Sequence, residues 1–167
     1  GRTLTSGHDA LGRPANLTYP SGLSVTQSFD PRNQLVGVAE GVNPIASFAW
    51  SGGHLAARSA GPVTGAFTVD DAGRLVDTAQ RTPQALLVDE EIAWLPRGLK
   101  SSIVRHDLGA AWGFDYDKAG RLTDAATSRP LPGLPVETSY TYDGAENLLH
   151  TTQLSACGAP TEIALPT

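Results

Sequence analysis

The sequence contains no methionine, a single cysteine and few charged residues. One cysteine, Cys157, cannot form an internal disulfide, so cysteine usage does not identify a redox compartment. Charged residues make up 17% of the chain, against roughly 25% in average proteins, which argues against long polar helices. No apolar run reaches the length of a membrane span, and no N-terminal pattern predicts a signal peptide. Because a starting methionine is absent, we expect a fragment of a longer protein.

Basic clusters are also absent, and the net charge is −5 with a pI near 5.2. A nucleic-acid-binding surface needs grouped lysines and arginines, so nucleic acid is not an expected partner. The chain is instead rich in turn formers. Its 18 glycines and 12 prolines are about 18% of the residues, against roughly 12% on average, which predicts many turns.

These turn formers belong to an internal repeat. A seven-residue window recurs every 20 to 26 residues, a period typical of repeat architectures. The seven windows, at 8–14, 29–35, 49–55, 69–75, 94–100, 116–122 and 142–148, are HDALGRP, FDPRNQL, AWSGGHL, VDDAGRL, WLPRGLK, YDKAGRL and YDGAENL.

Each window has the chemistry of a hairpin turn. The first position is mostly apolar or aromatic, and the second is Asp in five copies, where a short carboxylate closes the turn by accepting backbone N–H groups. In six of the seven windows position five carries Gly or Asn, which tolerate the positive φ of short hairpin loops. The predicted structural turn positions are Asp9, Gly12, Asp30, Asn33, Gly53, Asp70, Gly73, Gly98, Asp117, Gly120 and Asp143.

Three details of the windows lead to further expectations. We interpret the residue at position six as the solvent-facing neighbour of the Leu at position seven. In the third window, Trp50 takes the place of the Asp. In the last window, Glu146 stands at position five, so we expect a turn of different shape there.

Further breakers lie between the windows, at 20–22, 43–44, 61–62, 82–83, 108–109 and in the run RPLPGLP at 129–135, which we interpret as a loop excursion. Each repeat has two turns and two strands. This predicts an all-β meander of antiparallel hairpins with about seven repeats and about fourteen strands. Only the segment 84–95 has helix-like spacing, and its place in the repeat favours one long or two short strands. We expect one repeat array over 1–167, recognisable over 8–154.

The repeated YDKAGRL, VDDAGRL, HDALGRP, FDPRNQL and YDGAENL windows, together with the GRPANLTYPSGLSVTQSFD phrase at 12–30, resemble the YD-repeat, or Rhs-repeat, proteins. The resemblance implies a sheet that spirals into a hollow shell. Such shells enclose a toxic C-terminal domain in bacterial polymorphic toxins and insecticidal toxin complexes, and related shells occur in animal cell-adhesion receptors. The family's core segment with its Asp-Pro cleavage region has no counterpart in this sequence, so neither self-cleavage nor toxicity is assigned to any residue.

The sequence contains no recognisable catalytic or metal-binding constellation. The four histidines, His8, His54, His106 and His150, are scattered without metal-ligand spacing. The neighbouring carboxylates Asp70–Asp71 and Asp115–Asp117 could suggest acid–base chemistry, but Asp70 and Asp117 occupy the turn position of the repeat, which already explains their presence. Calcium is an alternative for acidic turns, but the GGxGxD and EF-hand patterns are absent. The Asn16-Leu17-Thr18 acceptor pattern for glycosylation is short enough to arise by chance. We therefore expect no enzyme activity, catalytic residue, metal or cofactor.

Aromatic residues provide the main alternative function. Phe29, Trp50, Trp94, Trp112, Tyr116 and Tyr142 recur about once per unit. Their presence is consistent with a cross-strand ladder that stabilises the sheet, or with rings that stack on sugars.

The favoured function is a structural shell segment that encapsulates a toxic C-terminal cargo. Its partners would be flanking repeats and the enclosed domain, and its location secreted or at the cell surface by resemblance. The alternative is a surface binding module for a glycan or a protein.

Overall fold

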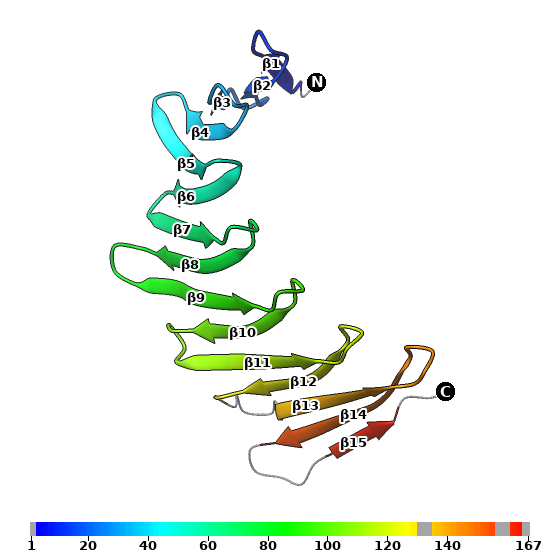
Figure 1. Ribbon diagram of the computed structural model, residues 1–167. Coiled ribbons are helices and arrows are strands. Elements are labelled where there is room, and N and C mark those ends of the chain that lie inside the picture. Colours follow the sequence, from blue (N-terminus) through cyan, green and yellow to red (C-terminus); the bar gives the residue numbers. More distant parts are fainter. Residues whose placement is uncertain (1–2, 130–134, 156–160, 165–167) are drawn as a thin grey trace. The chain divides into compact units, whose positions relative to one another are not determined.

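The computed structural model describes residues 3–129, 135–155 and 161–164. In this part of the chain there are fifteen β-strands and no helix, so none that could span a membrane (Figure 1). The chain divides into two compact units, Gly1–Leu87 and Val88–Thr167. Most of the loop expected at 129–135 lies outside the described residues, and so does Cys157.

Unit 1 is an antiparallel meander in which each strand pairs with the next one in sequence. Its strands are β1 (Thr5–His8), β2 (Pro14–Thr18), β3 (Ser24–Phe29), β4 (Leu35–Glu40), β5 (Asn43–Ser51), β6 (His54–Ala60), β7 (Val63–Val69) and β8 (Leu75–Arg81). The breaker expected at Asn43 and Pro44 is wrong, because the turn is made by the preceding Gly41 and Val42 and both residues lie in β5.

Unit 2 repeats this arrangement. Its strands are β9 (Leu86–Trp94, which begins in the last two residues of unit 1), β10 (Lys100–Arg105), β11 (Ala110–Tyr116), β12 (Leu122–Thr127), β13 (Pro135–Tyr142), β14 (Leu148–Ser155) and β15 (Thr161–Ala164). The segment with helix-like spacing is therefore one long strand, β9. The predicted all-β hairpin meander is confirmed, with fifteen strands in the described residues rather than about fourteen.

All seven sequence windows fall on the same kind of connection, from an odd-numbered strand to the following even-numbered one. Consecutive turns of a meander alternate between the two ends of the strands. Within each unit, the windows therefore lie along one edge of the sheet and the second set of turns along the other. We call the turns at 9–13, 30–34, 51–54, 70–74, 95–99, 117–121 and 143–147 the YD turns.

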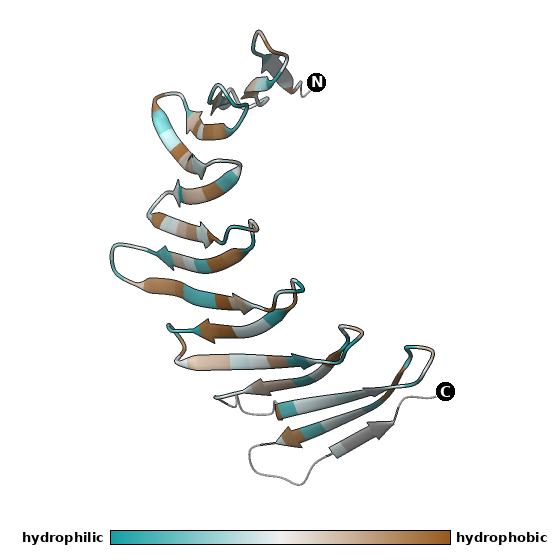
Figure 2. Cartoon of the chain, viewed as in Figure 1, coloured by the Kyte–Doolittle hydropathy of each residue, from teal (hydrophilic) through white to brown (hydrophobic). Residues whose placement is uncertain are grey.

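The two faces of each sheet differ in side-chain size, since successive residues of a strand point to opposite faces. In unit 1 the aromatic face carries Phe48, Trp50 and Phe67. The opposite, small-residue face has cross-strand rows of small side chains. One row is Ser28, Gly37, Ser47, Ser59 and Thr64, and another is Ala49, Ala57, Ala66 and Ala79. Figure 2 shows apolar and polar segments interspersed along the strands.

Unit 2 has the same two kinds of face. Ile92, Ile103 and Trp112 form a cross-strand row on its aromatic face. A row on the small-residue face holds Ala93, Ser102, Gly113 and Ala126.

Few side chains are buried, because each unit is a single layer. Among the described apolar residues, only Ile92 and Ala110 are less than a tenth exposed, at 4% and 6%. Stability therefore comes mainly from cross-strand pairs and turns rather than from a closed core.

Candidate functional site: the YD turns

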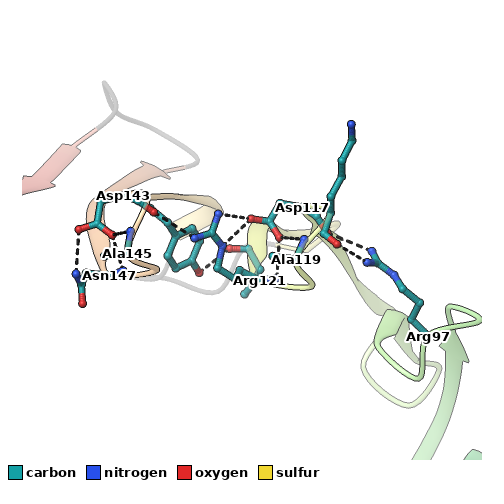
Figure 3. A network of polar contacts seen from close by, with 10 residues as sticks. Arg97, Asp117, Ala119, Arg121, Asp143, Ala145 and Asn147 are labelled. Atoms are coloured by element: carbon teal, nitrogen blue, oxygen red, sulfur yellow. Dashed lines mark hydrogen bonds and ion pairs between the residues drawn. The ribbon is translucent and has the colours of Figure 1, made fainter.

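The turn at 117–121 shows how one YD turn is built (Figure 3). The Asp117 N–H donates to the Arg121 carbonyl at 3.0 Å, and the Gly120 N–H donates to the Asp117 carbonyl at 3.1 Å. Gly120 has φ 87°, and the strand pairing shifts by one residue beside Tyr116. These features define a three-residue hairpin loop with a type I turn followed by a left-handed residue and a bulge.

The Asp117 carboxylate closes this loop from one side. Its Oδ1 accepts from the N–H groups of Ala119 and Arg121, both at 2.9 Å, and its Oδ2 accepts from Arg121 Nε at 2.7 Å. The backbone bond from Arg121, followed by its side-chain bond, lowers the pKa of Asp117 below its usual value. One residue therefore satisfies two backbone donors and orients the arginine.

The same arrangement recurs in the other aspartate turns. Asp9 and Asp70 bind the arginine at position six of their own windows, Arg13 and Arg74. Asp143 accepts from Ala145 N–H and Asn147 N–H, and also from Asn147 Nδ2 at 2.9 Å. Hydrogen bonds from these partners lower the pKa values of Asp9, Asp70 and Asp143. Asp30 accepts the two backbone bonds, from Arg32 and Gln34.

The turn at 95–99 has the same backbone without an aspartate. Leu95 N–H donates to the Leu99 carbonyl at 2.8 Å, and Gly98 N–H donates to the Leu95 carbonyl at 2.9 Å. Gly98 has φ 79°. The left-handed residue and the two backbone bonds therefore suffice for the shape, and the aspartate adds the carboxylate contacts.

Position five is left-handed in six of the turns. The φ values are 77° at Gly12, 71° at Asn33, 76° at Gly73, 79° at Gly98, 87° at Gly120 and 71° at Glu146. The different shape expected for the last turn is wrong. Asp143 N–H donates to the Asn147 carbonyl and Glu146 N–H to the Asp143 carbonyl, as in the other turns. The surrounding bonds thus hold a glutamate in a region that L-residues normally avoid.

The β5–β6 turn is the exception, and it corrects the alignment of the third window. Elsewhere positions one and seven pair, as in Phe29 with Leu35. Here Trp50 pairs with Leu55 and Ser51 with His54, which leaves a two-residue loop. Trp50 is therefore the position-one aromatic of a window shortened by one residue, and it does not replace the aspartate. The positive φ, 60°, lies at Gly52 and not at the predicted Gly53.

The side chains at position six do not simply face solvent, as the sequence alone indicated. Within each unit, every position-six side chain that has a following YD turn reaches toward that turn, and we call this contact the turn clasp. Arg13 Nη1 donates to Asn33 Oδ1 at 2.7 Å, and Gln34 Nε2 donates to the Gly52 carbonyl at 2.7 Å. The His54 ring lies over Gly73, with Cε1 2.8 Å from where a Cβ would stand.

Unit 2 continues the pattern. Leu99 Cδ1 lies 3.6 Å from the Cβ position of Gly120. Arg121 Nη1 donates to the Asp143 carbonyl at 3.4 Å, and Arg97, at position four, donates to the carbonyls of Asp117 and Lys118 (Figure 3). The clasp was not predicted from the sequence, because each window was interpreted by itself. The signal that could have located it is the regular spacing of 20 to 26 residues between the windows.

Three position-one aromatics also contact the hairpin that precedes them in their own unit. The Arg13 guanidinium lies 4.6 Å from the Phe29 ring centroid, and Arg121 lies 4.6 Å from that of Tyr142. Tyr142 Oη donates to the Leu122 carbonyl and Trp50 Nε1 to the Leu35 carbonyl, both at 2.8 Å. These contacts link each ring to the preceding hairpin.

The three remaining predicted aromatics occupy other places in their strands and hairpins. The Trp94 ring faces Lys100 Nζ of its own hairpin at 5.6 Å, and Tyr116 occupies position one of β11. Trp112 lies in the middle of β11, where it pairs with Ile103 and Thr127. Trp112 is therefore not a position-one residue.

The described residues contain no group of three or more His, Cys, Asp or Glu side chains that could hold a metal ion. Of the histidines, His106 Nε2 lies 3.6 Å from Glu91 Oε2 and His54 belongs to the turn clasp. Chemically, the YD turns of each unit can bind and orient neighbouring hairpins through carbonyls, carboxylates, guanidinium groups and rings.

The architecture is therefore an antiparallel meander of clasped YD-type hairpins. No protein-family model and no curated protein matches the sequence. Solved structures do resemble the fold. A Tc holotoxin pore of Photorhabdus luminescens that carries a TccC3 mutation has a TM-score of 0.77 and 20% identity, over 98% of this chain and 9% of that one.

The crystal structure of TcdB2-TccC3-Cdc42 gives the same TM-score and identity, over 98% of this chain and 10% of that chain. The crystal structure of TcdB2-TccC3 gives a TM-score of 0.73 at 20% identity, over 93% of this chain and 9% of that chain. The chain thus spans about a tenth of the proteins it resembles. These likenesses establish the fold, and they support the relationship to the YD-repeat, or Rhs-repeat, proteins that the windows indicate.

Proposed function

We propose that this chain is a wall segment of a toxin-associated β-shell, and that the shell encapsulates a C-terminal cargo domain. The observation that carries the proposal is the turn clasp, which joins each hairpin to the next along one edge in each unit. The fold likeness to Tc toxin structures over nearly the whole chain supports the same role.

The physical properties of the sheet suit a wall better than a soluble globular domain. A wall needs two faces exposed to different surroundings, and these sheets have an aromatic face and a small-residue face with little burial on either. A wall also has to resist the separation of neighbouring hairpins, which is what the clasp opposes. In this role the chain works without catalysis, its partners are flanking repeats and the enclosed domain, and its location is secreted or at the cell surface.

Protection from protease tests this function. The polypeptide from the complete reading frame would be digested under native conditions, and the survival of the cargo domain followed by mass spectrometry. We expect the cargo to survive in the parent protein and to be cut faster when Arg13→Ala and Arg121→Ala are combined, because the wall then opens more often. Lys118→Ala, an exposed side chain in a YD turn, is the matched control. A cargo that is cut rapidly in all three proteins would refute encapsulation, and a cargo that survives equally well in all three would refute the role of the clasp.

The glycan-binding alternative receives less support from the rings. Phe29 and Tyr142 each have a guanidinium over one face, and Trp94 has an ammonium. Rings engaged in this way are less available to stack on sugars. Glycan titration followed by tryptophan fluorescence separates the two functions, since only the binding module predicts a saturable shift.

A further inference from the structure

Trp112 takes no part in the turn clasp, and it lines a cavity on the aromatic face of unit 2. The cavity has a volume of about 150 Å³, and its lining among the described residues consists of Leu108, Ala110, Trp112 and Arg129. It lies at the edge opposite the YD turns, beside the turn at 106–109. An apolar cavity of this volume can hold a molecule as large as benzene. The Trp112 cavity is therefore large enough for one small ring.

The surface of the Trp112 cavity is almost entirely apolar. Ala110 is only 6% exposed, whereas Leu108 is 43% exposed, so solvent reaches the cavity from one side. Trp112 is held in β11 by its pairing with Ile103 and Thr127, which makes its ring a preformed part of the lining. A preformed apolar cavity with few polar groups is the usual form of a small-molecule site.

Arg129 supplies the charge at this cavity. Its backbone is fixed there, because its N–H donates to Thr127 Oγ1 at 3.4 Å and the preceding Ser128 N–H donates to the Ala111 carbonyl at 2.8 Å. The guanidinium reaches the turn at 106–109, where Nη1 donates to the Leu108 carbonyl. Within the described residues, Nε and Nη2 have no acceptor, and no acidic side chain pairs with Arg129. These donors lie in the planar fork that matches a carboxylate.

From this juxtaposition we propose that the Trp112 cavity binds a small hydrophobic carboxylate. The apolar part of the ligand lies beside the indole ring, and its carboxylate accepts from the N–H groups that Arg129 has to spare. Charge complementarity favours an anion, since Arg129 is the only charged residue in the described lining. A sugar fits less well, because it would bury hydroxyl groups against a surface with almost no polar partner. The inference rests on unit 2 alone and does not depend on encapsulation.

Phenylacetate tests this site in the full chain. It joins a benzene ring to one carboxylate, and phenylacetamide is its uncharged counterpart of nearly the same shape. Binding would be followed through the indole N–H signal of Trp112 by NMR, with the signal assigned by its loss in Trp112→Phe. We expect a saturable shift with a Kd of about 1 mM, as for a good ligand of about ten heavy atoms. Phenylacetamide should bind about five- to tenfold more weakly, because it forms no charge-assisted hydrogen bonds.

Two variants perturb the charge and the space of the cavity separately. Arg129→Gln should weaken phenylacetate to the level of phenylacetamide and leave phenylacetamide itself unchanged. Ala110→Val fills part of the cavity and should weaken both ligands at least about tenfold. The matched control is Ala111→Val, which adds the same two methyl groups to the opposite face of β11. This control should leave both Kd values unchanged.

The two ligands and the variants allow the proposal to fail at each step. Equal Kd values for phenylacetate and phenylacetamide would overturn the assignment of a carboxylate ligand. A Trp112 signal that shows no saturable shift would overturn the site. Binding that survives in Ala110→Val, or that is lost equally in Ala110→Val and Ala111→Val, would also overturn it.

Discussion

Replacement of Arg121 by alanine tests the clasp in the turn where its contacts are most completely defined. Arg121 binds Asp117 of its own turn, lies over the Tyr142 ring at 4.6 Å and donates to the Asp143 carbonyl at 3.4 Å. The Asp117 pair is partly exposed, at 30% and 23%, so solvent screens it. The contact to Tyr142 should contribute about 0.5–1 kcal/mol, and the long hydrogen bond less than a typical one. We expect Arg121→Ala to destabilise the protein by about 1–1.5 kcal/mol.

A double-mutant cycle separates the contact between hairpins from the contact within the turn. Urea unfolding followed by circular dichroism would be measured for Arg121→Ala, Tyr142→Leu and the double mutant. The coupling energy should be about 0.5–1 kcal/mol. Tyr142→Phe provides the control, because it keeps the ring and loses only the bond to the Leu122 carbonyl; its coupling to Arg121 should be close to zero. A coupling with Tyr142→Leu that is zero within error would refute the clasp as an energetic link between hairpins.

Four further outcomes follow from the turns of the meander. Gly12→Ala and Gly73→Ala should each cost about 1–2 kcal/mol from the positive φ, and Gly73→Ala should cost more because its Cβ displaces His54; equal losses would mean that the His54 contact is energetically silent. Glu146→Gly should stabilise by about 1 kcal/mol by relieving a left-handed L-residue, and a loss of stability in urea would contradict this. The side-chain bond from Arg105 lowers the pKa of Asp107 from 3.8 to about 2. Because the pKa of Asp107 is lower in the folded than in the unfolded state, this stabilisation is present above about pH 4 and is lost as the pH falls toward about 2. An acid titration in which the free energy of unfolding stays constant over this range would contradict the prediction. Chelators should leave the melting temperature unchanged, and a drop of several degrees would show that the acidic turns bind calcium.

The chemistry of single turns could be predicted from sequence because it is local. Asp117 and Gly120 lie within four residues of all the backbone groups that they serve, so the window itself contains the argument. The long strand β9 was predictable for a related reason, since the repeat period leaves room there only for strands.

The turn clasp could not be predicted in the same way. It joins residues about one repeat apart, and which atoms meet depends on the register between hairpins. Arg13 reaches Asn33 only because β2, β3 and β4 pair with particular offsets. The shortened third window was missed for a similar reason. Trp50 can be recognised as a position-one residue only from its pairing with Leu55.

Glu146 shows the limit of propensity arguments. Its residue type disfavours a positive φ, which led to the expectation of a different turn. The two backbone bonds and the Asp143 carboxylate nevertheless enforce the common shape. Where several bonds determine a conformation together, one unfavourable residue is tolerated at a cost in stability.

Electron microscopy of the protein from the complete reading frame tests the central claim most directly. If the chain is a wall segment, the particle is hollow, these strands lie in its wall, and density for a C-terminal domain lies inside. A particle without an internal cavity, or with this sequence folded outside the wall, would contradict the account.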